Sequence, residues 1–241
     1  MRSDFEYSLN YFLKRLHLAK GIFVDVGAND GKIGSMTYEL EKNGWTGILI
    51  EPNPVLVENL KKIRTSPVYP YAISSTEGEL PFYIVEGPNN MHGLSRFNYT
   101  NEFEAHVKKE GGSVHPTIVH VKKISTIMNE AHNLERVDFL KIDVEGHELE
   151  VLKSFDFIKY RPRLIVTEDN FKDADKAVRH LLQTAGYVVI ARDRINYWFA
   201  EKHEIKHFLY DYLHSKIRFL RWDLKRFIYR LMNKKIHTGN N

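Results

Sequence analysis

Hydrophobic and polar residues follow two repeating patterns along the chain. Buried strands are predicted at short, nearly continuous apolar runs, namely residues 22–26, 47–50, 68–74, 117–122, 137–144 and 163–168. Amphipathic helices are predicted where apolar residues recur at helical spacing, namely residues 4–18, 33–43, 55–63, 125–132, 148–155 and 173–184. Strands that alternate with helices in this way indicate an α/β fold.

Three further apolar stretches suit antiparallel strands. Residues 80–85 alternate in polarity and contain Pro81, which favours an edge position because proline lacks the N–H that an inner strand needs. Residues 187–191 and 196–200 predict a terminal hairpin. The predicted fold is therefore a doubly wound, mostly parallel sheet with an antiparallel edge.

The predicted domain covers residues 20–200, with a region on each side and one insertion. Residues 1–19 hold one amphipathic helix, which we expect to pack on the sheet. Residues 86–116 are rich in glycine and proline, with a short helical stretch near 102–109. A segment of this kind within a compact domain is either a lid that binds substrate or an inert loop. Residues 201–241 form a basic tail.

Composition narrows the class of protein. The 241 residues are 43% hydrophobic and 27% charged, which is ordinary for a soluble globular protein. The absence of cysteine excludes disulfides and thiolate metal sites. The first residues lack the apolar core of a signal peptide and no run is long enough to span a bilayer, so the expected location is the cytosol.

A glycine-rich turn follows the first predicted strand, in the sequence GIFVDVGANDG at residues 21–31. Strand, glycine turn and helix together open a nucleotide-binding unit. The dinucleotide spacing G-x-G-x-x-G fails, because counting from Gly27 brings Asn29 and Lys32 to the other two glycine positions. What remains is D-x-G-x-N-x-G, which resembles motif I of class I S-adenosylmethionine (SAM) methyltransferases, with Asn29 in place of the middle glycine. SAM has no pyrophosphate, so such a turn need only admit a methionine tail and a ribose. An ordinary tight turn is the alternative interpretation.

Glu51 supports the nucleoside interpretation. It ends the second predicted strand, twenty residues after Gly31. An acidic side chain at that distance suits two hydrogen bonds to ribose hydroxyls.

Four separated segments together resemble one enzyme family. DVGANDG at residues 25–31, EPNP at 51–54, AIS at 72–74 and KIDVEGHE at 141–148 resemble the FkbM-type SAM-dependent methyltransferases, and KIDVEGHE is the most diagnostic. The resemblance implies a seven-stranded, Rossmann-like class I fold and O-methylation of a sugar in a cell-surface or lipid-linked glycan. The residues then predicted to bind SAM are Asp25, Gly27, Ala28, Asn29, Gly31, Glu51, Pro52, Asn53, Ala72, Ile73, Ser74, Asp143, Val144 and Glu145.

Polar residues gather after the strands at 137–144 and 163–168, where an open α/β sheet binds its ligands. A hydroxyl is a weak nucleophile, so its methylation needs a general base, a metal ion or both. We expect His147 to be the base, with Asp143 and Glu168 in catalytic roles; an exposed histidine at a helix start is the alternative.

A Mg²⁺ site is the second expectation at these strand ends. Asp143, Glu168 and Asp169 offer the oxygen ligands that Mg²⁺ prefers. Alternatively, Asp143 helps to hold SAM while the other two orient His147 or bind sugar hydroxyls. His92, in the 86–116 insertion, either touches the acceptor or is a solvated loop histidine.

The tail at 202–235 predicts one or two basic amphipathic helices. Peripheral contact with an anionic membrane, packing across the domain and a homodimer interface all fit it. We expect no nucleic-acid partner, since the basic residues lack a recognition module. Rival functions are methylation of a small hydroxylated or phosphorylated metabolite and a non-catalytic scaffold with the SAM fold.

Overall fold

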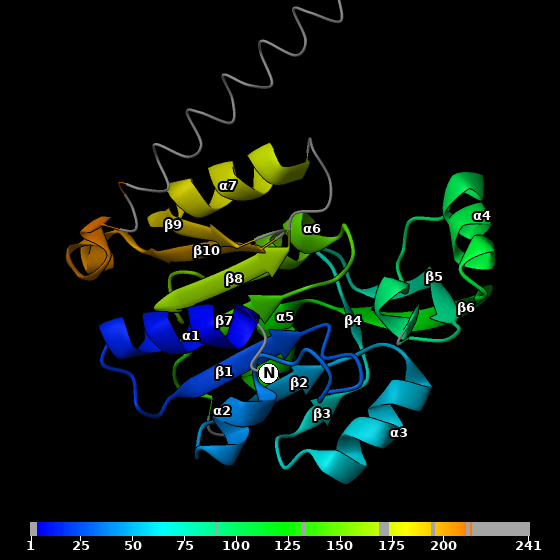
Figure 1. Cartoon of the computed structure of the whole chain (residues 1–241), viewed down its shortest axis with the longest axis horizontal. Coiled ribbons are helices and arrows are strands. Elements are labelled where there is room, and N and C mark those ends of the chain that lie inside the picture. The colour runs from blue at the N-terminus through cyan, green and yellow to red at the C-terminus, as the bar shows by residue number, and fades with distance from the viewer. Residues whose placement is uncertain are drawn as a thin grey trace, which may run out of the picture.

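The computed structural model describes residues 4–89, 91–131, 134–168, 174–193, 196–210 and 213. Figure 1 shows its elements in chain order: α1 (Asp4–Arg15), β1 (Ile22–Val26), α2 (Tyr38–Lys42), β2 (Thr46–Ile50), α3 (Pro54–Ile63), β3 (Val68–Tyr69), β4 (Ala72–Ile73), β5 (Gly78–Glu86), the 3₁₀ helix η1 (Met91–Leu94), α4 (Asn101–Lys109), β6 (Ser113–Lys122), α5 (Ile124–Glu130), β7 (Phe139–Ile142), α6 (Glu148–Lys153), β8 (Leu164–Glu168), α7 (Ala174–Thr184), β9 (Tyr187–Asp193), β10 (Asn196–Glu201) and the 3₁₀ helix η2 (Lys202–His207).

Seven strands form the main sheet, in the order β3-β2-β1-β7-β8-β10-β9. The first five are parallel, and β10 runs antiparallel to both β8 and β9. This order confirms the predicted doubly wound sheet with an antiparallel edge.

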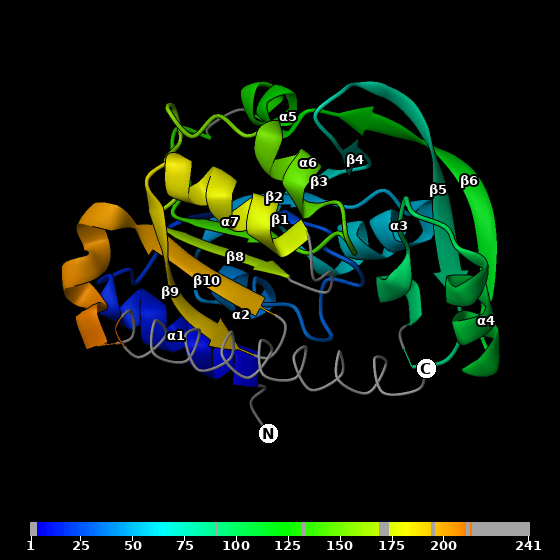
Figure 2. The ribbon, with the colours of Figure 1, turned by 90° about the horizontal axis from the view of Figure 1, so that it is seen from above.

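Each inner strand is buried on both faces, because helices cover the sheet on both sides (Figure 2). On β1, Val24 and Val26 pack with residues of α5, α6 and α7, whereas Phe23 packs with residues of α1, α2 and α3. Successive strand residues point to opposite faces, so an apolar run with no alternation suits a strand between two helical layers.

A second sheet, in the order β4-β6-β5, extends from one end of the main sheet (Figure 2). Its long hairpin pairs β5 with β6 from Gly78–Val121 to Glu86–Ser113. We call residues 78–122 the hairpin arm. As predicted, β5 is an edge strand that accommodates Pro81.

Two predicted segments change in the structure. The single strand predicted at 68–74 is wrong, because β3 and β4 belong to different sheets and Pro70 lies between them. The predicted insertion at 86–116 also extends too far, since β6 begins at Ser113 and Pro116 lies within it.

The helix predicted from Ile33 begins only at Tyr38. The carboxylate of Asp30 accepts hydrogen bonds from the N–H groups of Lys32 and Ile33, both at 2.8 Å, and so holds a turn there. Ile33 is 67% exposed and does not pack on the sheet.

The tail predicted at 202–235 begins with the short helix η2. The membrane, packing and dimer alternatives for the tail concern residues that lie mostly outside the described part of the chain. Among the described residues, no helix combines the length and apolar character needed to cross a bilayer.

Candidate functional site

A pocket of about 370 Å³ lies at the carboxyl ends of the parallel strands. Ligands in open α/β sheets bind at this edge. The main sheet contributes residues that follow β1, β2 and β7 or that end β8: Gly27, Asn29, Glu51, Pro52, Asp143, Val144, Glu145 and Glu168. The hairpin arm and β4 contribute most of the rest, including Ala72, Ile73, Phe82, Met91, His92, Leu94, Ser95 and Phe97.

The turn after β1 is closely packed against the end of β7. Gly27 has a φ of +79°, and a Cβ atom there would lie 1.9 Å from the carbonyl oxygen of Asp143. Lys141 donates a hydrogen bond of 2.6 Å to the carbonyl of Gly27 and lies 3.2 Å from the carboxylate of Asp25. Only glycine fits this position, for both conformational and steric reasons.

Lys141 is buried between two carboxylates. Burial alone would lower the pKa of its ammonium, but the charges of Asp25 and Asp143 outweigh burial and raise it above the ordinary value. Lys141 therefore stays charged and ties β1 to β7 beneath the pocket.

A second buried cation supports the turn from the other side. The Arg64 side chain has no exposed surface, and it donates to the carbonyl of Gly31 at 3.0 Å and to the hydroxyl of Thr37 at 3.2 Å. It also forms an ion pair with Glu41. Thr37 in turn donates to Asp25 at 2.6 Å. Asp25 and Gly31 thus shape the turn from behind the pocket and do not line it.

Glu51 is 5% exposed and faces the pocket. Its two carboxylate oxygens accept hydrogen bonds of 2.9 Å from the backbone N–H groups of Asn29 and Asn53. Burial raises the pKa of Glu51 to about 7, although these two donors and the Lys141 ammonium act in the opposite direction. A carboxylate has about four lone-pair sites, so each oxygen of Glu51 can accept one more hydrogen bond.

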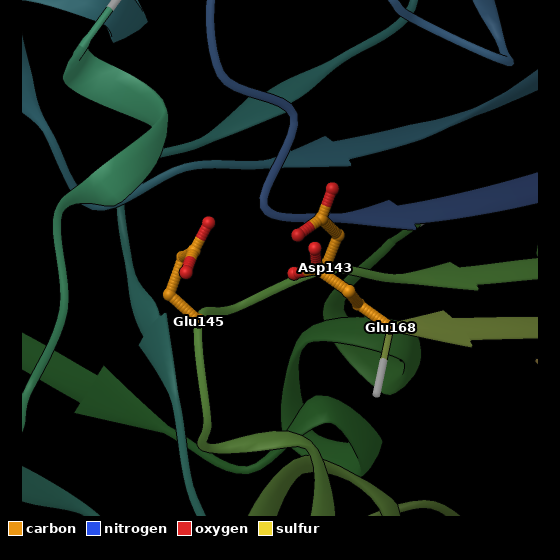
Figure 3. A group of neighbouring side chains, drawn as sticks. All are labelled: Asp143, Glu145 and Glu168. Carbon is orange, nitrogen blue, oxygen red and sulfur yellow. The ribbon is translucent and has the colours of Figure 1, made fainter. Parts of the chain in front are cut away.

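Three carboxylates converge on the other side of the pocket (Figure 3). Asp143, Glu145 and Glu168 each have an oxygen within 4.8 Å of the others. Asp143 and Glu168 follow or end the neighbouring strands β7 and β8, and their side chains lie next to each other in Figure 3. Glu145 pairs with Arg96 of the hairpin arm at 2.8 Å. Burial, together with the charge of Asp143, raises the pKa of Glu145 to about 7.

The predicted base, His147, does not line this pocket. Its Nε2 lies 3.0 Å from the hydroxyl of Ser74, and its ring centroid lies 4.5 Å from that of Phe97. Burial lowers the pKa of its imidazole. His147 therefore lies behind Phe97, whereas His92 lies on the pocket wall.

The other predicted residues divide between the pocket and its support. Pro52, Ala72, Ile73 and Val144 line the pocket, whereas Ala28, Asn53 and Ser74 do not. Asn53 caps α3 by accepting a hydrogen bond from the N–H of Val55 at 3.0 Å. Asp169, predicted as a metal ligand, lies outside the described residues.

Several contributing residues were not predicted. Arg64, Arg96 and Phe97 carry no local signal, because their partners lie far away in the sequence. Lys141 is different, since a lysine within an apolar strand must find a counter-charge and is visible as an anomaly in VDFLKIDV.

The chain resembles known methyltransferases. A model of the methyltransferase FkbM domain matches residues 25–189. Methyltransferase sdnD from Sordaria araneosa is 32% identical over 157 residues, which are 55% of this chain and 60% of that protein. Methyltransferase 1 from Beauveria bassiana is 48% identical over 42 residues, or 17% of each chain. The crystal structure of methyltransferase FkbM from Methylobacillus flagellatus KT matches with a TM-score of 0.48 and 15% identity, covering 83% of this chain and 56% of that one. The chain thus spans less than two thirds of the length of these relatives.

Proposed function

The chain belongs to the FkbM methyltransferase family, and we propose that it transfers the methyl group of SAM to a hydroxyl oxygen of a carbohydrate. One observation carries the proposal: a single pocket joins the buried carboxylate of Glu51 to the carboxylates of Asp143, Glu145 and Glu168. The first is suited to a ribose and the others to a charged, hydroxyl-bearing reaction centre.

The residues on the cofactor side fit SAM, which supplies a methyl group already activated on a positively charged sulfur. Glu51 keeps one acceptor position on each oxygen, which matches two neighbouring ribose hydroxyls. Ala72, Ile73 and Val144 offer an apolar wall to the adenine. The carboxylate of Asp143 offers negative charge to the sulfonium.

The residues on the acceptor side fit a polyol. Carboxylates accept hydrogen bonds from hydroxyl groups, and charged acceptors make the stronger bonds. Glu145 and Glu168 are therefore the residues that we propose to orient the acceptor, with Phe82 and Phe97 as the apolar surface beside it. A small hydroxylated metabolite with the same chemistry would bind in the same way, so the assay must separate it from a glycan.

A Mg²⁺ ion remains part of the proposal at the neighbouring carboxylates of Asp143 and Glu168. Its role would be to lower the pKa of the acceptor hydroxyl. Glu145 suits this role less well, since it is already paired with Arg96. Full turnover after exhaustive chelation would remove the metal from the proposal.

Calorimetry followed by a transfer assay tests the function. The full chain should bind SAM and S-adenosylhomocysteine, and a Glu51→Ala variant should bind both at least about tenfold more weakly, because about 1.4 kcal/mol corresponds to a factor of ten. Transfer of labelled methyl from SAM is then measured on methyl glycosides, on a lipid-linked glycan fraction and on small hydroxylated metabolites.

The outcomes separate the alternatives. Label in the glycosides or the glycan fraction supports the proposal. Label only in small metabolites would show that the acceptor is a small metabolite and not a glycan. No heat with SAM would indicate a scaffold and overturn the enzymatic function itself.

A further inference from the structure

We propose that His92 is the general base for methyl transfer, a role that rests on the proposed function. His92 belongs to η1, the short helix of the hairpin arm, and lines the same pocket as Glu51 and Asp143. It is half-buried.

The orientation of the His92 ring is fixed by the edge of β5. Nδ1 of His92 lies 3.2 Å from the carbonyl oxygen of Val85. The N–H of the same Val85 donates to the hydroxyl of Ser95 at 3.0 Å. A carbonyl oxygen accepts and never donates, so Nδ1 must carry the proton. In the neutral ring, Nε2 therefore carries the lone pair that a general base needs.

The segment that follows His92 is hydrogen-bonded to β5 and closely packed against the turn after β1. Main-chain hydrogen bonds of 2.9 and 3.1 Å pair Arg96 with Tyr83 on β5. The Arg96 guanidinium then reaches across to Glu145, which follows β7. On the other side, a Cβ atom at Gly93 would lie only 3.1 Å from the side-chain amide of Asn29. This part of the arm therefore lies against the turn after β1, next to His92.

The alternative base, His147, neither lines the pocket nor has an Nε2 atom without a hydrogen-bond partner. It does not line the pocket, and its Nε2 is engaged by the hydroxyl of Ser74. We infer that His147 is a positioning residue, which ties Ser74 to the start of α6 and backs the ring of Phe97.

The proposed step balances as follows. The acceptor oxygen bonds to the methyl carbon while the carbon–sulfur bond breaks, and the electron pair of that bond stays on sulfur as a neutral thioether. The hydroxyl proton passes to Nε2 of His92. One positive charge thus moves from sulfur to the imidazolium, in a pocket that Asp143, Glu145 and Glu168 also line.

Nitrogen NMR of the imidazole rings tests the placement without any acceptor. The full chain is labelled with ¹⁵N-histidine, and a His92→Gln variant assigns the signal by its loss. We expect the Nδ1–H tautomer at neutral pH and a change in the Nε2 signal when S-adenosylhomocysteine binds. A predominant Nε2–H tautomer, or a signal that S-adenosylhomocysteine leaves unchanged, would overturn the proposal.

Kinetics of three matched variants test the role. His92→Gln should lower kcat by about 100-fold or more, the range for loss of a general base, while the affinity for SAM changes by no more than about twofold. His147→Gln should lower kcat less than about tenfold, since it acts only through its neighbours. His106→Gln, on the exposed face of α4, is the control and should match the unaltered chain.

The two proposals fail in different ways. Binding of SAM without transfer to any acceptor of the panel would count against the carbohydrate, whereas the NMR result still decides the placement of His92. His92→Gln with more than about a tenth of the original kcat would overturn the base while leaving the methyltransferase intact.

Discussion

The two sides of the pocket are built in different ways. On the proposed cofactor side, and in the turn behind it, polar side chains are buried and hold hydrogen bonds or ion pairs within the protein: Asp25 is 1% exposed, Glu51 is 5% exposed and the Arg64 side chain is not exposed at all. On the acceptor side, the hairpin arm has two small apolar clusters, around Phe82 and around Val85, and Ile118 on β6 is 62% exposed.

This difference suits a cofactor that is the same in every reaction and an acceptor that differs between family members. Every member of a SAM-dependent family binds the same cofactor, so rigid, buried polar contacts serve the cofactor side well. Acceptors differ, and the arm is joined to the domain by the pairing of β4 with β6 and by ion pairs that include Arg96–Glu145 and Lys122–Glu130. Such an arm can change with less effect on the core. We therefore expect substitutions on the cofactor side to cost stability and SAM affinity, and those on the arm to change acceptor use.

Gly27→Ala should have the largest effect. The left-handed backbone costs an alanine about 1–2 kcal/mol, and its Cβ would collide with the main chain of Asp143. We expect a loss of about 4 kcal/mol or more in the free energy of unfolding, with no measurable binding of SAM. Chemical denaturation and calorimetry measure both.

The chain contains a matched control for this substitution. Gly34 has a φ of +72°, but a Cβ atom there meets nothing within 4 Å. Gly34→Ala should therefore cost only the backbone strain of about 1–2 kcal/mol. Equal losses in the two variants would show that the contact between the β1 turn and the end of β7 is not tight.

Arg64→Met should have the next largest effect. It leaves Glu41 without its buried partner and removes a donor from Gly31 and Thr37, so we expect a loss of about 3–5 kcal/mol. Lys61→Met is the control, because the side chains of its pair with Glu58 are 51% and 64% exposed and an exposed ion pair contributes only about 0–1 kcal/mol. A small effect at Arg64 would contradict the view that burial distinguishes the cofactor side.

The difference between the two sides also explains which parts of the site could be predicted from the sequence. The cofactor side depends on a strand, a glycine turn and an acid at the end of the next strand, and parallel strands bring those carboxyl ends together by topology alone. Gly27, Glu51 and Asp143 were therefore found from spacing and motif. Lys141 and Arg64 complete that site through contacts that no local pattern specifies.

The strands and contacts of the proposed acceptor side could not be predicted from local sequence patterns, for a physical reason. Pro70 separates two strands that looked like one, and Pro116 lies within a strand although it suggested a loop. The pairing of Arg96 with Glu145 joins residues 49 positions apart, so spacing along the chain could not indicate it. The sequence favours His147 over His92 because His147 lies in a short turn at the exit of a central strand, yet only His92 of these two lines the pocket.

The pH dependence of SAM affinity tests the cofactor side more finely. Burial raises the pKa of Glu51 from its ordinary value of 4.5 to about 7. The folded, unliganded chain then holds a proton that the unfolded chain releases, so Glu51 contributes less to stability as the pH rises from 4.5 to about 7. SAM affinity should change in the opposite direction, because only the carboxylate accepts both ribose hydroxyls well.

We expect calorimetry to show SAM affinity falling about tenfold per pH unit below about 7. Glu51→Gln should bind weakly and without this slope. Glu145 titrates in the same range, so Glu145→Gln is measured alongside and should keep the slope. If the slope disappeared in Glu145→Gln and persisted in Glu51→Gln, Glu51 would not be the carboxylate that binds the ribose.

Arg96→Met should have the smallest effect on the fold and the most selective effect on function. The ion pair with Glu145 is only 14% and 13% exposed, so its loss should cost about 1–3 kcal/mol of stability, less than the loss of the fully buried Arg64. The amides of residues 91–97 should exchange hydrogen faster, because residue 96 is then held only by its main-chain bonds to Tyr83 on β5. The KM for the glycoside acceptor should rise about tenfold while SAM affinity stays within about twofold.

Lys108→Met, which removes an exposed pair with Glu104 on the same arm, should change neither the KM nor the SAM affinity. If Arg96→Met weakened SAM as much as the acceptor, the arm would belong to the cofactor site, and the two sides of the pocket would act as one unit.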